Sequence, residues 1–277
     1  MAAPQHNEPV RIFWTGGWDS TFRIASAAIN LGCSIEPFYL IDPERGSVGH
    51  ELRAMHSIRQ RINQKVGRNM FLPTRYCNVD DLPEDDGITA AYGELRQNGY
   101  LGIQYEWLAR WARTLDISRI ELSIHVDDRA YAPIRPYLVR QNDDAGSYVL
   151  TAECPGEIAR VFGRFAFPVI HMTKRQMADA ARAAGFSDVM AMTWFCFQPR
   201  GGKPCGACNP CRYAMAEDMG HRIPRLRRIT GRWRDFRKRH LSAGLLLRST
   251  RRRVAGLRER VRRWSGGQSS DATPPGR

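Results

Sequence analysis

Short apolar runs alternate with amphipathic stretches over most of the chain. The runs Val10 to Trp14 and Ile35 to Ile41 consist largely of branched and aromatic side chains, as buried strands do. The stretch between them repeats apolar residues at helical spacing and ends at Gly32, a common helix terminator. We predict strands at residues 10–14, 35–41, 69–72 and 117–126, and helices at 19–31, 49–66, 103–115 and 172–184. Strands that alternate with helices predict an α/β fold with a doubly wound parallel sheet.

The turn between the first predicted strand and helix, residues 15–21, has the composition of a phosphate-binding loop. Paired glycines let the backbone approach a phosphate, and the start of a helix offers N–H groups and a positive dipole end. The predicted ATP-binding residues are Thr15, Gly16, Gly17, Ser20 and Thr21, with Asp19 placing Mg²⁺. The alternative is a tight turn in which Asp19 or Ser20 caps the helix. Neither G-x-x-x-x-G-K-[ST] nor G-x-G-x-x-G occurs at this position, so another type of nucleotide loop is not indicated.

These loop residues resemble the S-G-G-x-D-S-T loop of the N-type ATP pyrophosphatases, with Thr15 replacing the first serine. The resemblance implies that ATP adenylates a carboxylate, amide or base oxygen with release of pyrophosphate. A nitrogen or sulfur nucleophile then displaces AMP. We expect Asp19, Ser20 and Lys174 to act in catalysis, with Lys174 neutralising charge on the departing pyrophosphate.

Four cysteines crowd into residues 196–211 with the spacing C-x8-C-x2-C-x2-C. Four soft ligands separated by glycine and proline indicate a tetrahedral zinc site without an open position, so the metal would stabilise the fold. The predicted ligands are Cys196, Cys205, Cys208 and Cys211. An iron–sulfur cluster and free or redox-active thiols are the alternatives, although the ferredoxin pattern would need a further cysteine where Met215 stands.

The cysteines narrow the resemblance to one family. Residues 167–174, 193–196 and 204–211 resemble the C-terminal half of 7-cyano-7-deazaguanine synthase, and the likeness covers roughly residues 10–214. It implies a structural zinc and an ATP-driven reaction that converts 7-carboxy-7-deazaguanine with ammonia, through an amide, to the nitrile. The chain would then be a carbon–nitrogen ligase of queuosine biosynthesis.

The sequence departs from the family pattern at positions expected to bind the carboxylic acid substrate, here called the acceptor, rather than at positions expected to bind ATP. Where the family usually carries Y-P-D-x-R-P-E-F, residues 131–138 retain the tyrosine, arginine and proline but neither acid. Ala214 stands where an arginine is usual. Arg135 is our candidate for the substrate carboxylate, with a surface salt bridge as the alternative. The nearby residues 127–129 could compensate for the lost acids, or the substrate could be a different carboxylic acid.

The positive charge is concentrated at the C-terminal end. Residues 222–277 hold 18 lysines and arginines against three acids, so their formal charge is +15 and that of the preceding residues is −1. We predict a pyrophosphatase-like domain over residues 1–221, a basic amphipathic helical appendage over 222–264 and a disordered tail over 265–277. The appendage fits an anionic membrane, RNA phosphates or an acidic partner, and a partly disordered solubilising tail is the alternative.

Cysteine usage and the N-terminal residues favour a cytoplasmic protein, peripheral to a membrane if the basic tail binds one. The expected partners are a small carboxylic acid and ammonia, and a homodimer is the oligomer considered. The aromatic side chains at 105, 107 and 111 are predicted to be core residues. A zinc-stabilised RNA-binding protein on a degenerate ATPase fold is the main alternative function, and a sulfur-inserting tRNA enzyme is a weaker one.

Overall fold

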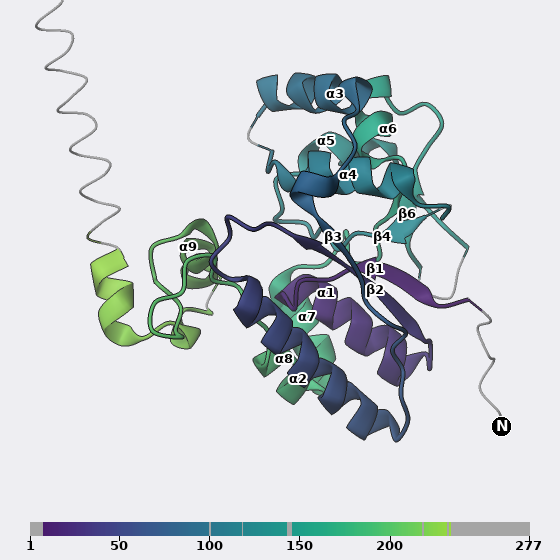
Figure 1. Cartoon of the computed structure of the whole chain (residues 1–277). Coiled ribbons are helices and arrows are strands. Elements are labelled where there is room, and N and C mark those ends of the chain that lie inside the picture. The colour runs from purple at the N-terminus through teal and green to yellow at the C-terminus, as the bar shows by residue number, and fades with distance from the viewer. Residues whose placement is uncertain are drawn as a thin grey trace, which may run out of the picture. The chain divides into compact units, whose positions relative to one another are not determined.

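The computed structural model describes residues 8–99, 101–117, 119–142, 146–217, 219–231 and 233. The chain divides into two units, Met1–Pro204 and Cys205–Arg277. The first unit is built on a five-stranded parallel sheet with helices on both faces (Figure 1). The predicted α/β fold with a parallel sheet is therefore confirmed.

The strand order of the sheet is β3-β2-β1-β4-β7, which places β1 at the centre. The strands are β1 (Val10–Phe13), β2 (Ile35–Ile41), β3 (Arg75–Asn78), β4 (Ile120–Glu121) and β7 (Phe165–Ala166). The chain first builds outward from β1 to β3 and then returns to add β4 on the opposite side of β1. A crevice that binds ligands is expected at such a reversal, beyond the carboxyl ends of β1 and β4. A separate antiparallel hairpin pairs β5 (Leu138–Arg140) with β6 (Tyr148–Leu150).

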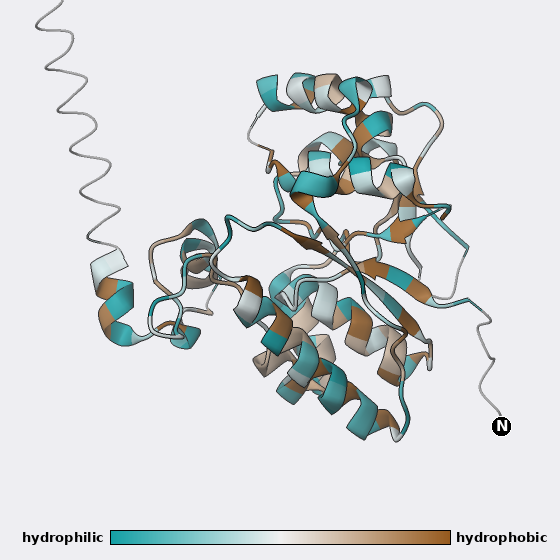
Figure 2. Cartoon of the chain, in the orientation of Figure 1, coloured by the Kyte–Doolittle hydropathy of each residue, from teal (hydrophilic) through white to brown (hydrophobic). Residues whose placement is uncertain are grey.

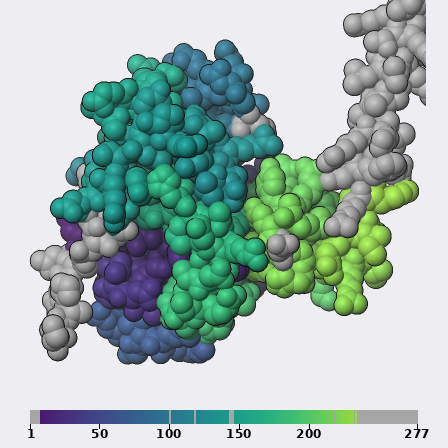
Figure 3. All heavy atoms as spheres, turned by 180° about the vertical axis from the view of Figure 1, so that it is seen from behind, coloured from purple at the N-terminus to yellow at the C-terminus, as the bar shows by residue number. Residues whose placement is uncertain are grey.

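Helices of the first unit form a layer on each face of the sheet (Figure 1). One layer contains α1 (Trp18–Ala25), continued by a π-helical turn (Ser26–Asn30), α2 (Val48–Val66), α7 (Lys174–Ala183) and α8 (Ser187–Ala191). The other contains α3 (Asp86–Gln97), α4 (Gln104–Thr114), α5 (Tyr131–Ile134) and α6 (Gly156–Phe162). In Figure 3, which shows the opposite side, purple N-terminal residues lie between blue residues of the α2 region and teal residues of the other layer.

Alternation along β1 divides the apolar core into two parts. Ile12 and Trp14 are fully buried and belong to the cluster that includes α1, α2, α7 and α8. Phe13 points to the other face, where it packs against Phe38 and Trp111. Because side chains in a strand alternate between faces, one short strand can anchor both helical layers. Figure 2 shows the hydrophobic strands between helices with many hydrophilic residues.

The second unit begins at Cys205 and contains α9 (Asn209–Ala216) and a 3-10 turn (Gly220–Arg222). Ile223 is buried, whereas Leu226, Ile229 and Trp233 are exposed. Most of the predicted appendage 222–264 and all of the predicted tail 265–277 lie outside the described residues. Among the helices that the structure describes, none combines the length and the hydropathy that a membrane span requires.

Two predicted strands differ from the structure. Residues 69–72 form no strand: Asn69 Oδ1 accepts a hydrogen bond from Phe71 N, and only a single bridge joins Phe71 to Ile35. The edge strand lies instead at β3, whose side chains are mostly exposed and give no apolar alternation. The predicted strand 117–126 reduces to the two residues of β4.

Candidate active site

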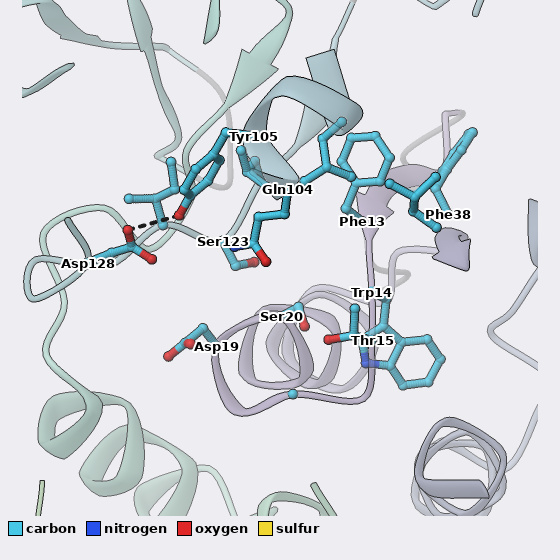
Figure 4. A pocket seen from close by; sticks show the side chains of 15 residues that line it. Phe13, Trp14, Thr15, Asp19, Ser20, Phe38, Gln104, Tyr105, Ser123 and Asp128 are labelled. Atoms are coloured by element: carbon cyan, nitrogen blue, oxygen red, sulfur yellow. Dashed lines mark hydrogen bonds between the residues drawn. The ribbon is translucent and has the colours of Figure 1, made fainter. Parts of the chain in front are cut away.

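A cavity of about 190 Å³ lies beyond the carboxyl ends of β1 and β4. Its lining comes from β1 and the loop after it, from the first turn of α1, from β2, from α4 and from the segment that follows β4 (Figure 4). This is the position at which the strand order reverses, so the backbone topology creates the crevice expected there. Two walls face each other across the cavity. The segment after β1 forms one wall, and residues of α4 and of the segment after β4 form the other.

The first wall, here called the loop wall, consists of Thr15, Gly17, Asp19 and Ser20. Gly17 is extended, with φ −75° and ψ 168°, and serves as the N-cap of α1. No side chain of the described residues caps this helix, so its first-turn N–H groups are not occupied by a capping oxygen. A helix start with this geometry binds anions through its N–H groups and its dipole. The wall therefore fits the phosphates of ATP.

Gly16 gives the loop its sharp turn. Its φ of +68° lies in the left-handed region that favours glycine. A Cβ atom at this position would lie 3.2 Å from Glu51 O and 3.2 Å from the Cβ of Ala54, both on α2. Gly16 does not line the cavity, so its part in the loop is conformational.

The aromatic side chain of Trp194 supports the loop from behind. Trp194 N donates a hydrogen bond of 2.9 Å to Gly16 O, and the ring stacks on His50 with centroids 4.4 Å apart. Partial burial and the nearby Arg53 lower the pKa of His50. Trp194 Nε1 also donates to Cys196 O at 2.8 Å. One tryptophan thus links the loop after β1 to a predicted metal ligand.

The hydroxyls predicted to bind ATP separate into two groups. Thr15 is exposed and Ser20 half-buried, and both line the cavity. Thr21 is fully buried, and its Oγ1 accepts a hydrogen bond of 3.0 Å from Trp14 Nε1. The structure therefore brings Thr15 and Ser20 to the cavity but turns Thr21 into the core beneath the loop.

The opposite wall presents Gln104, Tyr105, Ser123 and Asp128 (Figure 4). Tyr105 OH donates to Asp128 Oδ1 at 2.9 Å, and Ala130 N donates to the same oxygen at 2.8 Å. Burial and the adjacent Asp128 carboxylate hold the pKa of Tyr105 well above its ordinary value. The prediction that Tyr105 is a core residue is incomplete: it is only 4% exposed, but it also lines the cavity.

Lys174 and Arg135 are not among the residues that line this cavity. Lys174 is the first residue of α7, whose capping box is made by Thr173 and Gln176. Arg135 is exposed on a 3-10 turn. Their assigned contacts with pyrophosphate and with the substrate carboxylate remain predictions.

The four predicted metal ligands come together. The sulfur atoms of Cys196, Cys205, Cys208 and Cys211 all lie within 4.8 Å of one another. Cys205 Sγ also accepts hydrogen bonds from the N–H groups of Ala207 at 3.4 Å and Cys208 at 3.3 Å.

The spacing of these sulfur atoms fits a single tetrahedral ion. Zn–S bonds of about 2.3 Å place the ligand sulfurs about 3.8 Å apart. The sulfur atoms of Cys205 and Cys211 are 3.9 Å apart. In an iron–sulfur cluster the cysteine sulfurs bind different iron atoms and are therefore farther apart than the ligands of a single ion. The observed spacing fits zinc better than an iron–sulfur cluster.

Comparison with known proteins identifies one family. The model of the family described as "Queuosine biosynthesis protein QueC" matches residues 78–216, a segment that includes α4, Asp128 and all four cysteines but not the loop wall. Comparison with curated proteins gives no match.

A solved structure, the NMN synthetase from Francisella tularensis, is similar at 11% identity with a TM-score of 0.31. The match covers 66% of this chain and 64% of that chain, so this protein spans less than two thirds of it. Because the family match extends over half of the sequence, the protein belongs to the QueC family of queuosine biosynthesis proteins.

Proposed function

We propose that this protein is an ATP-dependent carbon–nitrogen ligase that converts 7-carboxy-7-deazaguanine and ammonia into 7-cyano-7-deazaguanine. One observation carries the proposal: in a member of the QueC family, a glycine-rich helix start opens into a cavity at the reversal point of a parallel sheet. Such a position suits a reaction in which a nucleotide phosphate meets a second substrate.

The loop wall supplies the nucleotide contacts in this proposal. Gly17 and the first-turn N–H groups of α1 bind phosphate oxygens, assisted by the hydroxyls of Thr15 and Ser20. Asp19 holds the Mg²⁺ that accompanies ATP, because carboxylate oxygens are preferred ligands of that ion. Lys174 neutralises charge on the pyrophosphate as it leaves. Zinc would be held by the four cysteines and would stabilise the fold, since all four positions are filled by protein.

Two adenyl transfers account for the product. A carboxylate oxygen attacks the α-phosphorus of ATP and pyrophosphate leaves; ammonia then attacks the carbonyl carbon, and AMP departs with that oxygen as a proton is lost. The amide oxygen is adenylated by a second ATP in the same way. Loss of AMP and the remaining N–H protons forms the carbon–nitrogen triple bond. AMP is the leaving group each time, so no protein nucleophile is required.

A pyrophosphate-release assay with product mass analysis tests the proposal. Release should require both 7-carboxy-7-deazaguanine and ammonium, and the product should have the mass of the nitrile. Release with another acid, but not with this one, would replace the substrate while keeping the reaction class. No pyrophosphate under any condition, together with RNA binding, would favour the degenerate ATPase alternative and overturn the proposal.

A further inference from the structure

We propose that Asp128, held in place by Tyr105, recognises N–H groups on the heterocyclic ring of the acceptor acid, with Gln104 and Ser123 completing that recognition. The inference rests on the proposed function and deepens it, because it assigns the wall opposite the phosphate loop to the acceptor. Figure 4 shows these side chains across the cavity from Thr15, Asp19 and Ser20.

The Asp128 carboxylate has one oxygen fixed internally. Oδ1 receives the hydrogen bonds from Tyr105 OH and Ala130 N, and neither bond involves Oδ2. A carboxylate that is oriented by two donors loses little conformational freedom when a ligand binds to its second oxygen. Asp128 lines the cavity, so that oxygen is a preorganised acceptor for a ligand N–H group.

Tyr105 stays protonated, so its hydrogen bond to Asp128 always runs in the same direction. Burial raises its pKa, and the neighbouring Asp128 carboxylate raises it further. The phenol therefore remains protonated at physiological pH and acts as a donor toward Asp128. Because Tyr105 belongs to α4 and Asp128 to the segment after β4, the bond also fixes the distance between the two elements that form this wall.

Ser123 provides a second, independent indication that a ligand occupies this wall. Its Oγ atom is buried, lines the cavity and has no hydrogen-bond partner among the residues that the structure describes. A buried hydroxyl without a partner is costly, and a polar ligand atom would remove that cost. The Gln104 amide adds both a donor and an acceptor at the same wall.

Apolar side chains around these polar groups indicate a flat ring as the ligand. The cavity is also lined by Phe13, Phe38, Leu40, Leu108, Leu122 and Ile124. Apolar walls with a few convergent polar groups bind a ring by its faces and read its edge by hydrogen bonds. A fused lactam ring with adjacent N–H donors meets that description. No acidic residue occurs in residues 131–138, so Asp128 is the acid available at this wall.

Calorimetric binding of two acids to the full chain tests the assignment. The acids are 7-carboxy-7-deazaguanine and 7-carboxy-7-deazaadenine, which lacks the lactam N–H and the 2-amino group. The measurement is made with a non-hydrolysable ATP analogue present. Wild-type protein should bind the guanine-type acid at least about tenfold more tightly, and Asp128→Asn should weaken that binding by about 10- to 100-fold and abolish the preference.

Two controls make the outcome decisive. Asp116→Asn removes the same charge from an exposed position outside the cavity and should bind both acids as wild type does. The ATP analogue alone should bind wild type and Asp128→Asn within about twofold. Equal acid binding by wild type and Asp128→Asn would overturn this inference but not the proposed function. A loss confined to the ATP analogue would assign the wall to the nucleotide and overturn the inference. Absence of acid binding to wild type, with the analogue bound, would overturn both.

Discussion

The two walls of the cavity differ in how the chain builds them. The loop wall, from Thr15 to Ser20, is one continuous segment that runs from the end of β1 into the first turn of α1. The opposite wall draws Gln104 and Tyr105 from α4, and Ser123 and Asp128 from the segment that follows β4. A short continuous segment can provide one type of binding site in many different enzymes. In a wall assembled from distant segments, single residues can be substituted without altering the others, so ligand specificity can change. This contrast agrees with the proposal that the nucleotide binds at the first wall and the acceptor acid at the second.

The largest expected effect on stability comes from a substitution in the cysteine site. We expect this site to stabilise the loop wall more than the opposite wall. Cys211→Ser removes a buried ligand and should lower the zinc content from about one ion per chain, with a loss of several kcal/mol in folding free energy. Because Trp194 joins Cys196 O to Gly16 O, affinity for an ATP analogue should fall more than affinity for the acid. Metal analysis, thermal unfolding and calorimetry measure these changes. Cys33→Ser, at a buried cysteine outside the cluster, is the control; unchanged zinc content in Cys211→Ser would refute the ligand assignment.

Asp19→Asn tests the chemistry assigned to the loop wall. Losing the carboxylate that places the metal should reduce pyrophosphate release by about 100-fold or more, since preorganised electrostatic groups contribute on that scale. Acid binding at the opposite wall should change little. Steady-state kinetics and calorimetry check both parts, and release within about threefold of wild type would contradict the role of Asp19.

Adjacent glycines of the loop should respond differently to alanine. Gly16→Ala places a Cβ atom at φ +68° and against α2, so we expect the free energy of unfolding to fall by about 1–3 kcal/mol. Gly17 has an ordinary φ of −75°, and its added Cβ would lie 3.3 Å from Thr15 Oγ1. Gly17→Ala should therefore keep its stability but bind the ATP analogue about tenfold more weakly. Chemical denaturation and calorimetry distinguish the two; the reverse pattern would show that Gly17, not Gly16, sets the loop conformation.

Tyr105→Phe tests how the opposite wall is held. The variant retains the ring but loses the hydrogen bond to Asp128, so acid affinity should fall about fivefold while ATP-analogue affinity is unchanged. Stability should fall by about 1 kcal/mol. If ATP-analogue binding decreases instead, the two walls do not have separate ligands.

The smallest effect concerns alkaline pH. The pKa of Tyr105 is raised in the folded protein, so its contribution to stability is complete below the unfolded pKa of about 10 and is lost as pH rises above it. Denaturant unfolding from about pH 9 to pH 11 should show a smaller decline in Tyr105→Phe than in wild type. Tyr39, whose pKa burial and Glu51 also raise, contributes to the decline in both proteins. Identical declines would show that Tyr105 is not shifted.

Sequence patterns predicted what is local in this protein. The order of glycines and hydroxyls at residues 15–21 singled out the segment that lines one side of the cavity, and cysteine spacing singled out the four sulfurs that meet. Thr21 could not be distinguished from Ser20, because only the fold shows that its hydroxyl accepts from the buried Trp14. Strand β3 was missed because an exposed edge strand has no apolar alternation.

The opposite wall depends on contacts between segments far apart in the sequence. Tyr105 lies among helix-spaced aromatic residues, which predict a core position, and its hydroxyl was the one signal of a polar partner. In the sequence Asp128 was one of the residues 127–129 that could compensate for the lost acids, whereas Arg135 was the candidate for the substrate carboxylate and lies outside the cavity lining. Side-chain type alone does not determine which of two nearby residues the turn after β4 directs inward.

Transfer of oxygen from the acid to AMP tests the central claim most directly. With 7-carboxy-7-deazaguanine labelled with ¹⁸O in both carboxylate oxygens, adenylation followed by displacement must leave one labelled oxygen on the phosphate of AMP. The account predicts AMP with one ¹⁸O atom, formed only when ammonium is present, and pyrophosphate without label. Label in inorganic phosphate with ADP as the nucleotide product, or unlabelled AMP formed alongside the nitrile, would contradict it.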